Sequence, residues 1–218
     1  MTWLHPKSII DISKENITQI LGSDASKLSI TLRFEPGQSL DKYIDSQMKS
    51  TLGLAECHTL EMQMASALAY LHASSVTHDD VKPDNIMWDM PQQRCVLIDF
   101  GAAMNCTVQP IEAFNPSGTP PYVPPEFLRR QKSSAGDVWA LGIVMLFALR
   151  YVPLPDGNWL LPAVFEDIAV QQEMLDWLAE IERLRKGLAE TRGLLAEMLE
   201  TDPESRVSAS DLVHRLGE

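Results

Sequence analysis

Two short segments of this 218-residue sequence concentrate side chains that can hold a cation, take up a proton and neutralise negative charge. Residues 78–85 read HDDVKPDN, and residues 99–101 read DFG, beginning 14 positions after Asn85. Carboxylate and amide oxygens are the ligands that Mg²⁺ prefers, and a carboxylate can also act as a base. Carboxylates that converge on one cleft repel each other unless a cation lies between them. The two segments therefore suggest a site that uses a metal ion.

The same segments resemble the signature of eukaryotic-type protein kinases. That family carries H-R-D-L-K-x-x-N followed by D-F-G, and the chemically active positions match here at the expected spacing. Three further segments match in the family's order: residues 118–126 (GTPPYVPPE), 137–142 (DVWALG) and 202–206 (DPESR). The resemblance extends roughly from Leu32 to Leu216.

The resemblance implies phosphoryl transfer from ATP with Mg²⁺ and gives roles to the matched residues. Asp80 would orient the acceptor hydroxyl and take its proton, while Lys82 would place its ammonium beside the γ-phosphate. Asp99 and Asn85 would hold magnesium ions against the phosphates. Thr119 would brace both Asp80 and Lys82. By the same resemblance, residues 78–85 would form the catalytic loop.

Six further matched residues would have structural roles: His78, Phe100, Gly101, Glu126, Asp137 and Arg206. By resemblance, His78 and Phe100 would stack in the interior. Asp137 would hydrogen-bond the backbone of the catalytic loop, and Arg206 would pair with Glu126.

Two features bear on the ligands. Met87 stands where the family places a floor under the adenine ring, although a methionine in an apolar run is also ordinary core filler. Residues 118–122, together with Lys82, resemble the Ser/Thr kinases rather than the Tyr kinases. The expected acceptor is a protein Ser or Thr, with a small-molecule hydroxyl as the alternative.

The sequence departs from the family in two places. The residues before Leu32 contain neither a G-x-G-x-x-G loop nor V-A-I-K, so the strands that cover ATP are expected to be missing, unless a partner chain completes them or the sequence is a fragment. Asp79 replaces an arginine that normally receives an activation-loop phosphate, and a carboxylate would repel one. Activation by phosphorylation is therefore not expected. Thr107 and Ser117 are either modification sites or ordinary loop hydroxyls.

The elements that position these residues follow from periodicity. Residues 8–34 alternate β-rich runs with breaks at 14–16 and 22–24, which predicts two or three antiparallel strands. Residues 85–88 and 95–100 predict a strand pair between the two loops. Helices are predicted over 40–48 with Ser39 as cap, over 59–71, over 136–149 in the interior, over 170–199 with interruptions at Gly187 and Gly193, and after a capping box at Ser208 and Asp211.

Composition limits the class of protein. With 45% hydrophobic and 22% charged residues the chain is globular, and a formal charge of −12 argues against nucleic-acid binding. The longest apolar stretch, 138–149, is too short to cross a bilayer. Cys57, Cys95 and Cys106 are far apart without a C-x-x-C pair, which favours reduced thiols. We expect a soluble intracellular protein, cytoplasmic or nuclear, with no nucleic-acid or membrane partner.

These observations predict an α+β, protein-kinase-like fold. Residues 1–37 would form a remnant β-sheet with the hinge, and residues 38–218 a large helical lobe. The predicted function is an atypical phosphotransferase that moves the γ-phosphate of ATP to a hydroxyl with Mg²⁺. The alternative is a pseudokinase, a binding or scaffold module without catalysis, because the Gly-rich loop and the ATP-binding lysine are missing.

Overall fold

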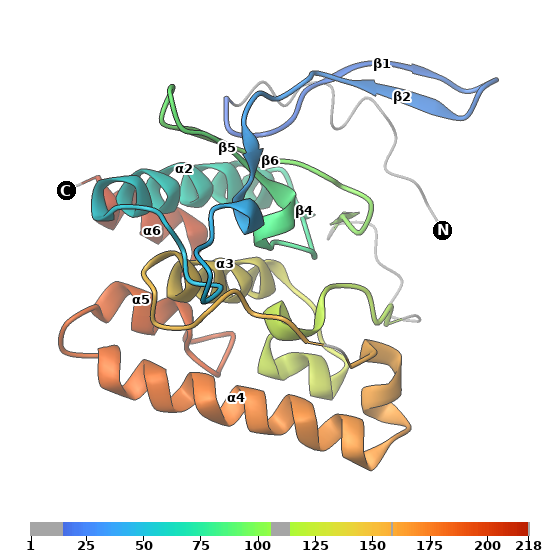
Figure 1. Cartoon of the computed structure of the whole chain (residues 1–218). Helices are drawn as coiled ribbons and strands as arrows, with labels where there is room; N and C mark the ends of the chain where they lie inside the picture. The colour runs from blue at the N-terminus through green and yellow to red at the C-terminus, as the bar shows by residue number, and fades with distance from the viewer. Residues whose placement is uncertain (1–14, 106–113, 158, 218) are drawn as a thin grey trace.

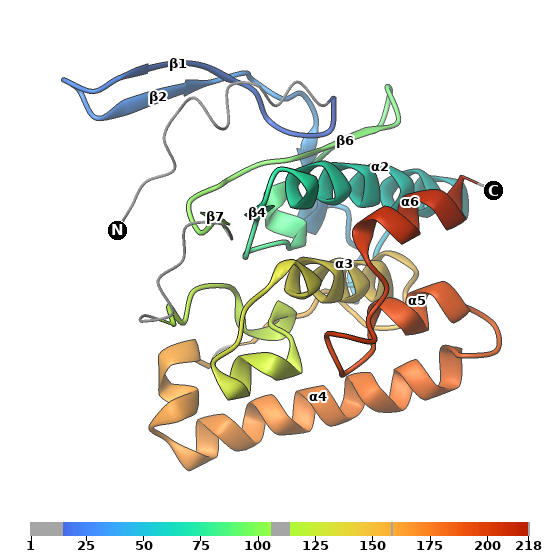
Figure 2. The ribbon, with the colours of Figure 1, turned by 180° about the vertical axis from the view of Figure 1, so that it is seen from behind.

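The computed structural model describes residues 15–105, 114–157 and 159–217, so the β-rich run at 9–13 and the residues Cys106 and Thr107 lie outside it. The described chain is a helical body with small β-sheets on one side (Figures 1 and 2). Its α-helices are α2 (Leu54–Ala73), α3 (Ser134–Ala148), α4 (Ile168–Leu188), α5 (Gly193–Met198) and α6 (Ala209–Leu216). Short 3₁₀ helices are η1 (Leu40–Lys42), η2 (Pro83–Asn85), η3 (Pro120–Tyr122), η4 (Pro125–Arg129) and η5 (Leu161–Phe165). The predicted α+β class is confirmed.

Helix α3 forms the centre of the core. Every residue from Asp137 to Ala148 is buried, as expected for a helix that is apolar on all sides. Helices α2 and α5 pack against it, and at Gly142 a Cβ atom would come within 2.8 Å of Leu199 Cδ2. The predicted interior helix is confirmed, with its start two residues earlier, at Ser134.

Helix α2 confirms the helix predicted over 59–71 and is longer at both ends. The Glu56 carboxylate accepts the Gly53 N–H at 2.6 Å and so satisfies a donor that the first turn leaves free. The helix then begins at Leu54. None of the helices in the described ranges is long and apolar enough to span a membrane.

Strands β5 (Ile86–Asp89) and β6 (Arg94–Leu97) pair antiparallel, which confirms the predicted strand pair. Strand β3 (Gln38–Ser39) adds to β5. The chain enters β3 through Gly37, whose φ is +96° and whose Cβ, if present, would lie 2.1 Å from the carbonyl oxygen of Trp88. Only glycine permits this approach without a shift of the backbone.

Strands β4 (Val76–Thr77) and β7 (Met104–Asn105) also pair antiparallel. Strand β4 leads directly into the catalytic loop, and β7 follows the loop that contains residues 99–101. This pairing therefore holds the start of the catalytic loop next to the end of the loop that contains residues 99–101.

Strands β1 (Ile20–Asp24) and β2 (Ser29–Leu32) form an antiparallel ribbon that projects beyond the helical body (Figures 1 and 2). The break predicted at 22–24 is wrong, because these residues pair with 29–31 and the turn comes later. The Asp24 carboxylate accepts the backbone N–H groups of Ser26 and Lys27 at 3.0 and 3.3 Å. This side-chain cap moves the turn past Asp24.

Two helix predictions also need correction. Of the helix expected over 40–48, only η1 forms, and Ser39 makes no side-chain cap. The Asp45 carboxylate accepts the N–H groups of Gln47 and Lys49 at 2.8 and 3.0 Å, and this local competition turns the chain. In α4, Gly187 does not interrupt the helix, which ends at Leu188 before α5 begins at Gly193.

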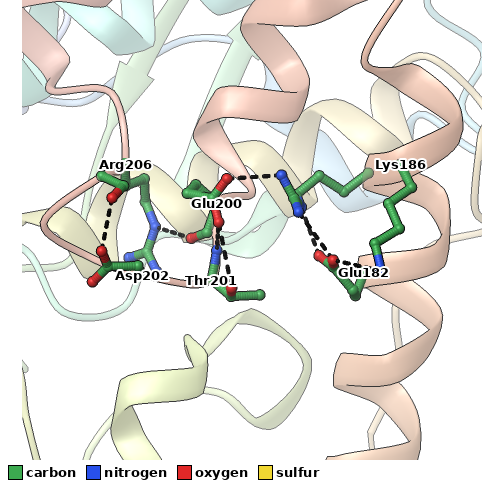
Figure 3. A network of polar contacts seen from close by, with 8 residues as sticks. Glu182, Lys186, Glu200, Thr201, Asp202 and Arg206 are labelled. Carbon is green, nitrogen blue, oxygen red and sulfur yellow. Dashed lines mark hydrogen bonds and ion pairs between the residues drawn. The ribbon is translucent and has the colours of Figure 1, made fainter.

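A polar network joins α4 to the segment between α5 and α6 (Figure 3). Arg185 on α4 bonds Glu182 in its own helix and Glu200 beyond α5. The Nε of Arg206 donates to the Glu200 carbonyl at 2.8 Å. Helix α6 then starts after Ser208, whose hydroxyl accepts the Asp211 N–H at 3.1 Å as the capping prediction expected.

Candidate active site

The catalytic loop and the loop after β6 lie side by side. The Ile98 N–H donates to the Asn85 carbonyl at 2.9 Å. The ring of His78 provides a second connection between the two loops. Its Nδ1 accepts the Asp80 N–H at 3.3 Å, so Nε2 carries the proton and donates to the Ile98 carbonyl at 3.0 Å. Burial lowers the pKa of His78, which keeps the ring in this neutral form.

The ring of His78 meets Phe100 edge to face, with centroids 4.8 Å apart. The predicted stacking of these two residues is present. Next to it, the Asp99 backbone has a φ of 60°, and its Oδ1 accepts the Gly101 N–H at 3.0 Å. A Cβ at Gly101 would also lie 3.0 Å from this oxygen, which explains the glycine there. The Asp99 side chain is thereby fixed on an exposed turn.

Asp137 at the start of α3 holds the beginning of the catalytic loop. Its two oxygens accept the backbone N–H groups of His78 at 2.8 Å and Asp79 at 2.9 Å. His72 of α2 lies 2.9 Å from the same carboxylate, whose side chain is 1% exposed. These contacts match the backbone role predicted for Asp137. The unusual φ of +65° at Asp79 is stabilised by this bridge.

Four predicted residues meet at one point. Thr119 Oγ1 donates to Asp80 Oδ1 at 2.7 Å and accepts from Lys82 Nζ at 2.7 Å, as the bracing role requires. The other oxygen of Asp80 lies 3.0 Å from Lys82 Nζ and accepts from Asn85 Nδ2, also at 3.0 Å. Such a cluster can orient a hydroxyl, take its proton and present a cation beside it.

Asn85 and Asp99 provide oxygens suited to a divalent cation. Asn85 Nδ2 donates to both the carbonyl and the carboxylate of Asp80, so the amide turns its oxygen away from Asp80. Among the described residues there is no cluster of three or more His, Cys, Asp or Glu that could hold a metal ion. Magnesium in phosphate sites is typically bound by one or two carboxylates together with substrate phosphates, and this donor set fits that requirement.

Met87 lies in the middle of β5, paired with Ser39 on one side and Val96 on the other. It is partly exposed, whereas its neighbours Ile86 and Trp88 are fully buried. The pleat therefore directs Met87 away from the core, which favours the ligand-facing interpretation over core filler.

Sequence reasoning missed an ion pair beside this cluster. Lys132 Nζ lies 2.5 Å from Asp79 Oδ2 and donates to Ser117 Oγ at 2.7 Å. Burial raises the pKa of Asp79 to about 6 and lowers that of Lys132. Lys132 had no local signal, because it stands in the polar run RRQKSS and is 53 residues from its partner.

Two aromatic side chains support the segment around residues 118–122. Trp177 on α4 donates its indole N–H to the Pro121 carbonyl at 2.8 Å. The Tyr122 hydroxyl donates to the Pro155 carbonyl at 3.3 Å. At the end of the same segment, Glu126 forms the predicted pair with Arg206 through two hydrogen bonds of 2.7 and 2.9 Å. The segment from Gly118 to Glu126 is therefore held in its middle by Trp177 and at its end by Arg206.

Comparison with known proteins gives consistent matches. The family model described as protein kinase domain matches residues 7–216. Maternal embryonic leucine zipper kinase of Xenopus tropicalis is 30% identical over 194 residues, covering 86% of this chain and 28% of that protein. CBL-interacting protein kinase 22 of Oryza sativa subsp. japonica is 31% identical over 198 residues, covering 86% of this chain and 41% of that protein.

A third relative, serine/threonine-protein kinase ppk34 of Schizosaccharomyces pombe, is 27% identical over 212 residues, covering 93% of this chain and 56% of that protein. The chain thus spans between 28% and 56% of the length of these three relatives.

Proposed function

This chain belongs to the protein kinase family, and we propose that it moves the γ-phosphate of ATP to a hydroxyl group with Mg²⁺ as cofactor. The observation that carries the proposal is the meeting of Lys82, Asn85 and Thr119 at the Asp80 carboxylate, with Asp99 on the adjacent loop. We propose further that residues 1–37 correspond to a remnant of the small lobe and residues 38–218 to the large lobe.

In this proposal Asp80 orients the acceptor. Three contacts, from Thr119, Asn85 and Lys82, fix its carboxylate, so an acceptor hydroxyl within reach would meet a base in one orientation. The hydroxyl proton passes to the Asp80 carboxylate as the oxygen bonds to phosphorus. Lys82 then lies where it can neutralise charge on the transferred phosphoryl group. The leaving group is ADP.

Asn85 and Asp99 would hold the cation through their side-chain oxygens. When bound with the nucleotide, Mg²⁺ supplies charge neutralisation at the β- and γ-phosphates. Two protein ligands are too few for a tight site, since this ion retains its water unless several anionic oxygens surround it. The expected order is therefore binding of the metal together with ATP.

The acceptor that we propose is a protein Ser or Thr. The segment Gly118 to Tyr122, read with Lys82, supports this choice, and ppk34 is described as a serine/threonine-protein kinase. A small-molecule hydroxyl is the alternative. Cys57 and Cys95 are free and buried, in keeping with a reducing compartment such as the cytoplasm or nucleus.

The second candidate function is a pseudokinase that binds a partner without transferring phosphate. The residues before Leu32 carry neither G-x-G-x-x-G nor V-A-I-K, and every residue of β2 is exposed. A lone two-stranded ribbon is marginally stable in water. A partner chain that covers the ribbon would complete the roof over ATP in the first proposal and would be the ligand in the second.

Transfer of labelled phosphate to a generic Ser/Thr substrate, measured beside thermal melting, separates the two. Saturation at about 100 times the dissociation constant adds about 2.7 kcal/mol to the free energy of unfolding. Asp80→Asn should lower transfer by at least about 100-fold while keeping the ATP–Mg²⁺ shift in melting temperature, and Asp99→Asn should abolish the shift.

Asp84→Asn is the matched control, because Asp84 is exposed in the same loop. A wild-type chain that neither transfers phosphate nor melts higher with millimolar ATP and Mg²⁺ contradicts the enzyme and favours the binding module.

A further inference from the structure

We propose that the part-buried Asp79–Lys132 ion pair, bridged by Ser117, positions the segment that carries Thr119 for catalysis without any phosphate on the chain. The structural part of this inference concerns the fold alone. Its catalytic part rests on the proposed phosphotransferase function.

The contacts of Lys132 use all three of its N–H donors. Its ammonium lies 2.5 Å from Asp79 Oδ2, 2.7 Å from Ser117 Oγ and 2.9 Å from the Ser117 carbonyl oxygen. The Ser117 hydroxyl in turn donates to Asp79 Oδ2 at 2.5 Å. The Lys132 ammonium, the Ser117 hydroxyl and Asp79 Oδ2 therefore form a closed set in which each of the three contacts the other two.

Burial makes the two charges depend on each other. The side chains of Asp79 and Lys132 are each 11% exposed, and the rings of Phe114 and Phe127 lie 5.8 and 5.9 Å from the ammonium. The lysine is thus surrounded by one carboxylate, one serine and two aromatic faces. Removing either charged group would leave the other without its partner, in a site where water can hydrate the remaining charge only poorly.

The ion pair lies next to both segments that supply the Asp80–Thr119 contact. Asp79 directly precedes Asp80, and Ser117 precedes Thr119 by two residues, through Gly118 with a φ of +110°. A Cβ at Gly118 would lie 3.3 Å from the Asp79 carbonyl oxygen, so the two backbones are in close contact. Fixing Ser117 against Asp79 therefore fixes Thr119 opposite Asp80.

Lys132 also connects this point to the core. It immediately precedes Ser133, the residue at the N-cap of α3, and the Asp79 N–H is held by Asp137 in the first turn of the same helix. The catalytic loop, the segment before Thr119 and the start of α3 are consequently joined at one part-buried ion pair.

The sign of the charges explains why a phosphate is unnecessary. The arginine that the family carries at the position of Asp79 normally receives an activation-loop phosphate, which balances that cation. Here the chain supplies both members, a carboxylate on the catalytic loop and an ammonium before α3. A phosphate at Ser117 would add negative charge next to the Asp79 carboxylate.

The test uses the full chain after phosphatase treatment, with absence of phosphate verified by mass spectrometry. Hydrogen–deuterium exchange is followed at residues 114–123, and kcat and KM for ATP are measured for the wild type, Lys132→Met, Lys132→Arg and Ser117→Ala. Lys186→Met is the matched control, because this lysine is 71% exposed on α4.

In the wild type we expect protected amides over 114–123 and full activity without phosphate. Lys132→Met should exchange at least about tenfold faster there, with α2 unchanged, and should lower kcat by about 10- to 100-fold, with KM for ATP within about threefold. Lys132→Arg, which keeps the positive charge, should retain most of the protection at residues 114–123 and most of kcat. Ser117→Ala, which keeps both charges, should lower the protection and kcat by less than Lys132→Met does.

Unprotected 114–123 amides or dependence on phosphorylation in the wild type would overturn the inference, even if Lys132→Met fails to fold. A Lys132→Met variant that folds and keeps the wild-type kcat and the wild-type hydrogen–deuterium exchange at residues 114–123 would also overturn the inference. If the wild type transfers no phosphate yet Lys132→Met loses protection at 114–123, the proposed function fails and the positioning of the segment stands.

Discussion

Glu126 and Arg206 meet in two parallel hydrogen bonds although 80 residues separate them in the sequence. Their side chains are 1% and 0% exposed, and the guanidinium also donates to the Ala135 and Glu200 carbonyls. The end of the segment that carries Thr119 is thus attached to the loop before α6. A buried pair of this kind is costly to break from one side, because the remaining charge has no partner.

Arg206→Leu is therefore expected to lower the free energy of unfolding by about 3 to 5 kcal/mol. Urea denaturation measures it. The comparison is Arg183→Leu, which removes a pair with Glu180 on the surface of α4 and should change stability by less than about 1 kcal/mol. A double variant Glu126→Leu/Arg206→Leu that is no more stable than Arg206→Leu alone would contradict the explanation by a stranded carboxylate.

Thr119→Val should lower kcat by about 10- to 100-fold, because the hydroxyl that holds Asp80 and Lys82 at 2.7 Å each is lost while the volume is retained. Thr119→Ser keeps the hydroxyl and should retain most of the activity. Steady-state kinetics with varied ATP tests this, since KM for ATP should change little. Equal losses in both variants would indicate that packing of the methyl group matters instead.

Ser117→Asp should reduce activity, although such a substitution imitates phosphorylation. The new carboxylate would face Asp79, whose Oδ2 lies 2.5 Å from the present hydroxyl, and would compete for Lys132. We expect a larger loss than in Ser117→Ala, measured as kcat/KM in parallel assays. Activation by Ser117→Asp would show that this position responds to phosphate in the usual sense.

The pH dependence of stability should carry a contribution from His78. Burial lowers the pKa of this ring below its ordinary 6.5, against the opposing influence of Asp137, Asp80 and Asp99. The unfolded chain therefore binds a proton more readily than the folded one, and the free energy of unfolding decreases as the pH falls below about 6.5. Above that pH the contribution of the neutral ring is fully present.

His78→Phe removes this titration and keeps a ring beside Phe100. Its free energy of unfolding, compared with that of the wild type by denaturation between pH 5 and 8, should differ less at pH 5 than at pH 8. A difference that is constant over this range would show that His78 titrates equally in both states.

Gly37→Ala should destabilise the fold or detach β3, because the added methyl group would lie 2.1 Å from the Trp88 carbonyl oxygen at a φ of +96°. Gly22→Ala is the control within the same region, since a Cβ there would meet nothing within 4 Å. Circular dichroism melting of both variants separates the effect of position from the general effect of replacing glycine.

The long periodic elements could be predicted from the sequence, because α2 and α3 repeat apolar residues over several turns. The ends of helices and strands could not be predicted where a single side-chain carboxylate determines them. Asp24 delays the turn after β1, and Asp45 ends the helix that began at Leu40. Such side-chain bonds to the backbone compete locally and leave no periodic signal.

The residues of the site also fall into those that the sequence predicts and those that it does not. Asp80, Lys82 and Asn85 fall in one short motif, so the resemblance of that motif to the family predicts them from the sequence alone. Lys132 lies outside every motif, and its pairing with Asp79 depends on how the fold brings distant segments together. Trp177 likewise supports Pro121 from another helix, 56 residues away.

The carboxylate of Asp137 has a consequence for the behaviour of the chain on heating. It belongs to the central helix and at the same time accepts the N–H groups of His78 and Asp79, so loosening the start of the loop requires breaking these contacts with the helix. Loosening of the catalytic loop on heating should coincide with melting of the whole core instead of preceding it. The ribbon of β1 and β2, by contrast, is free to fray at lower temperature without disturbing the loop.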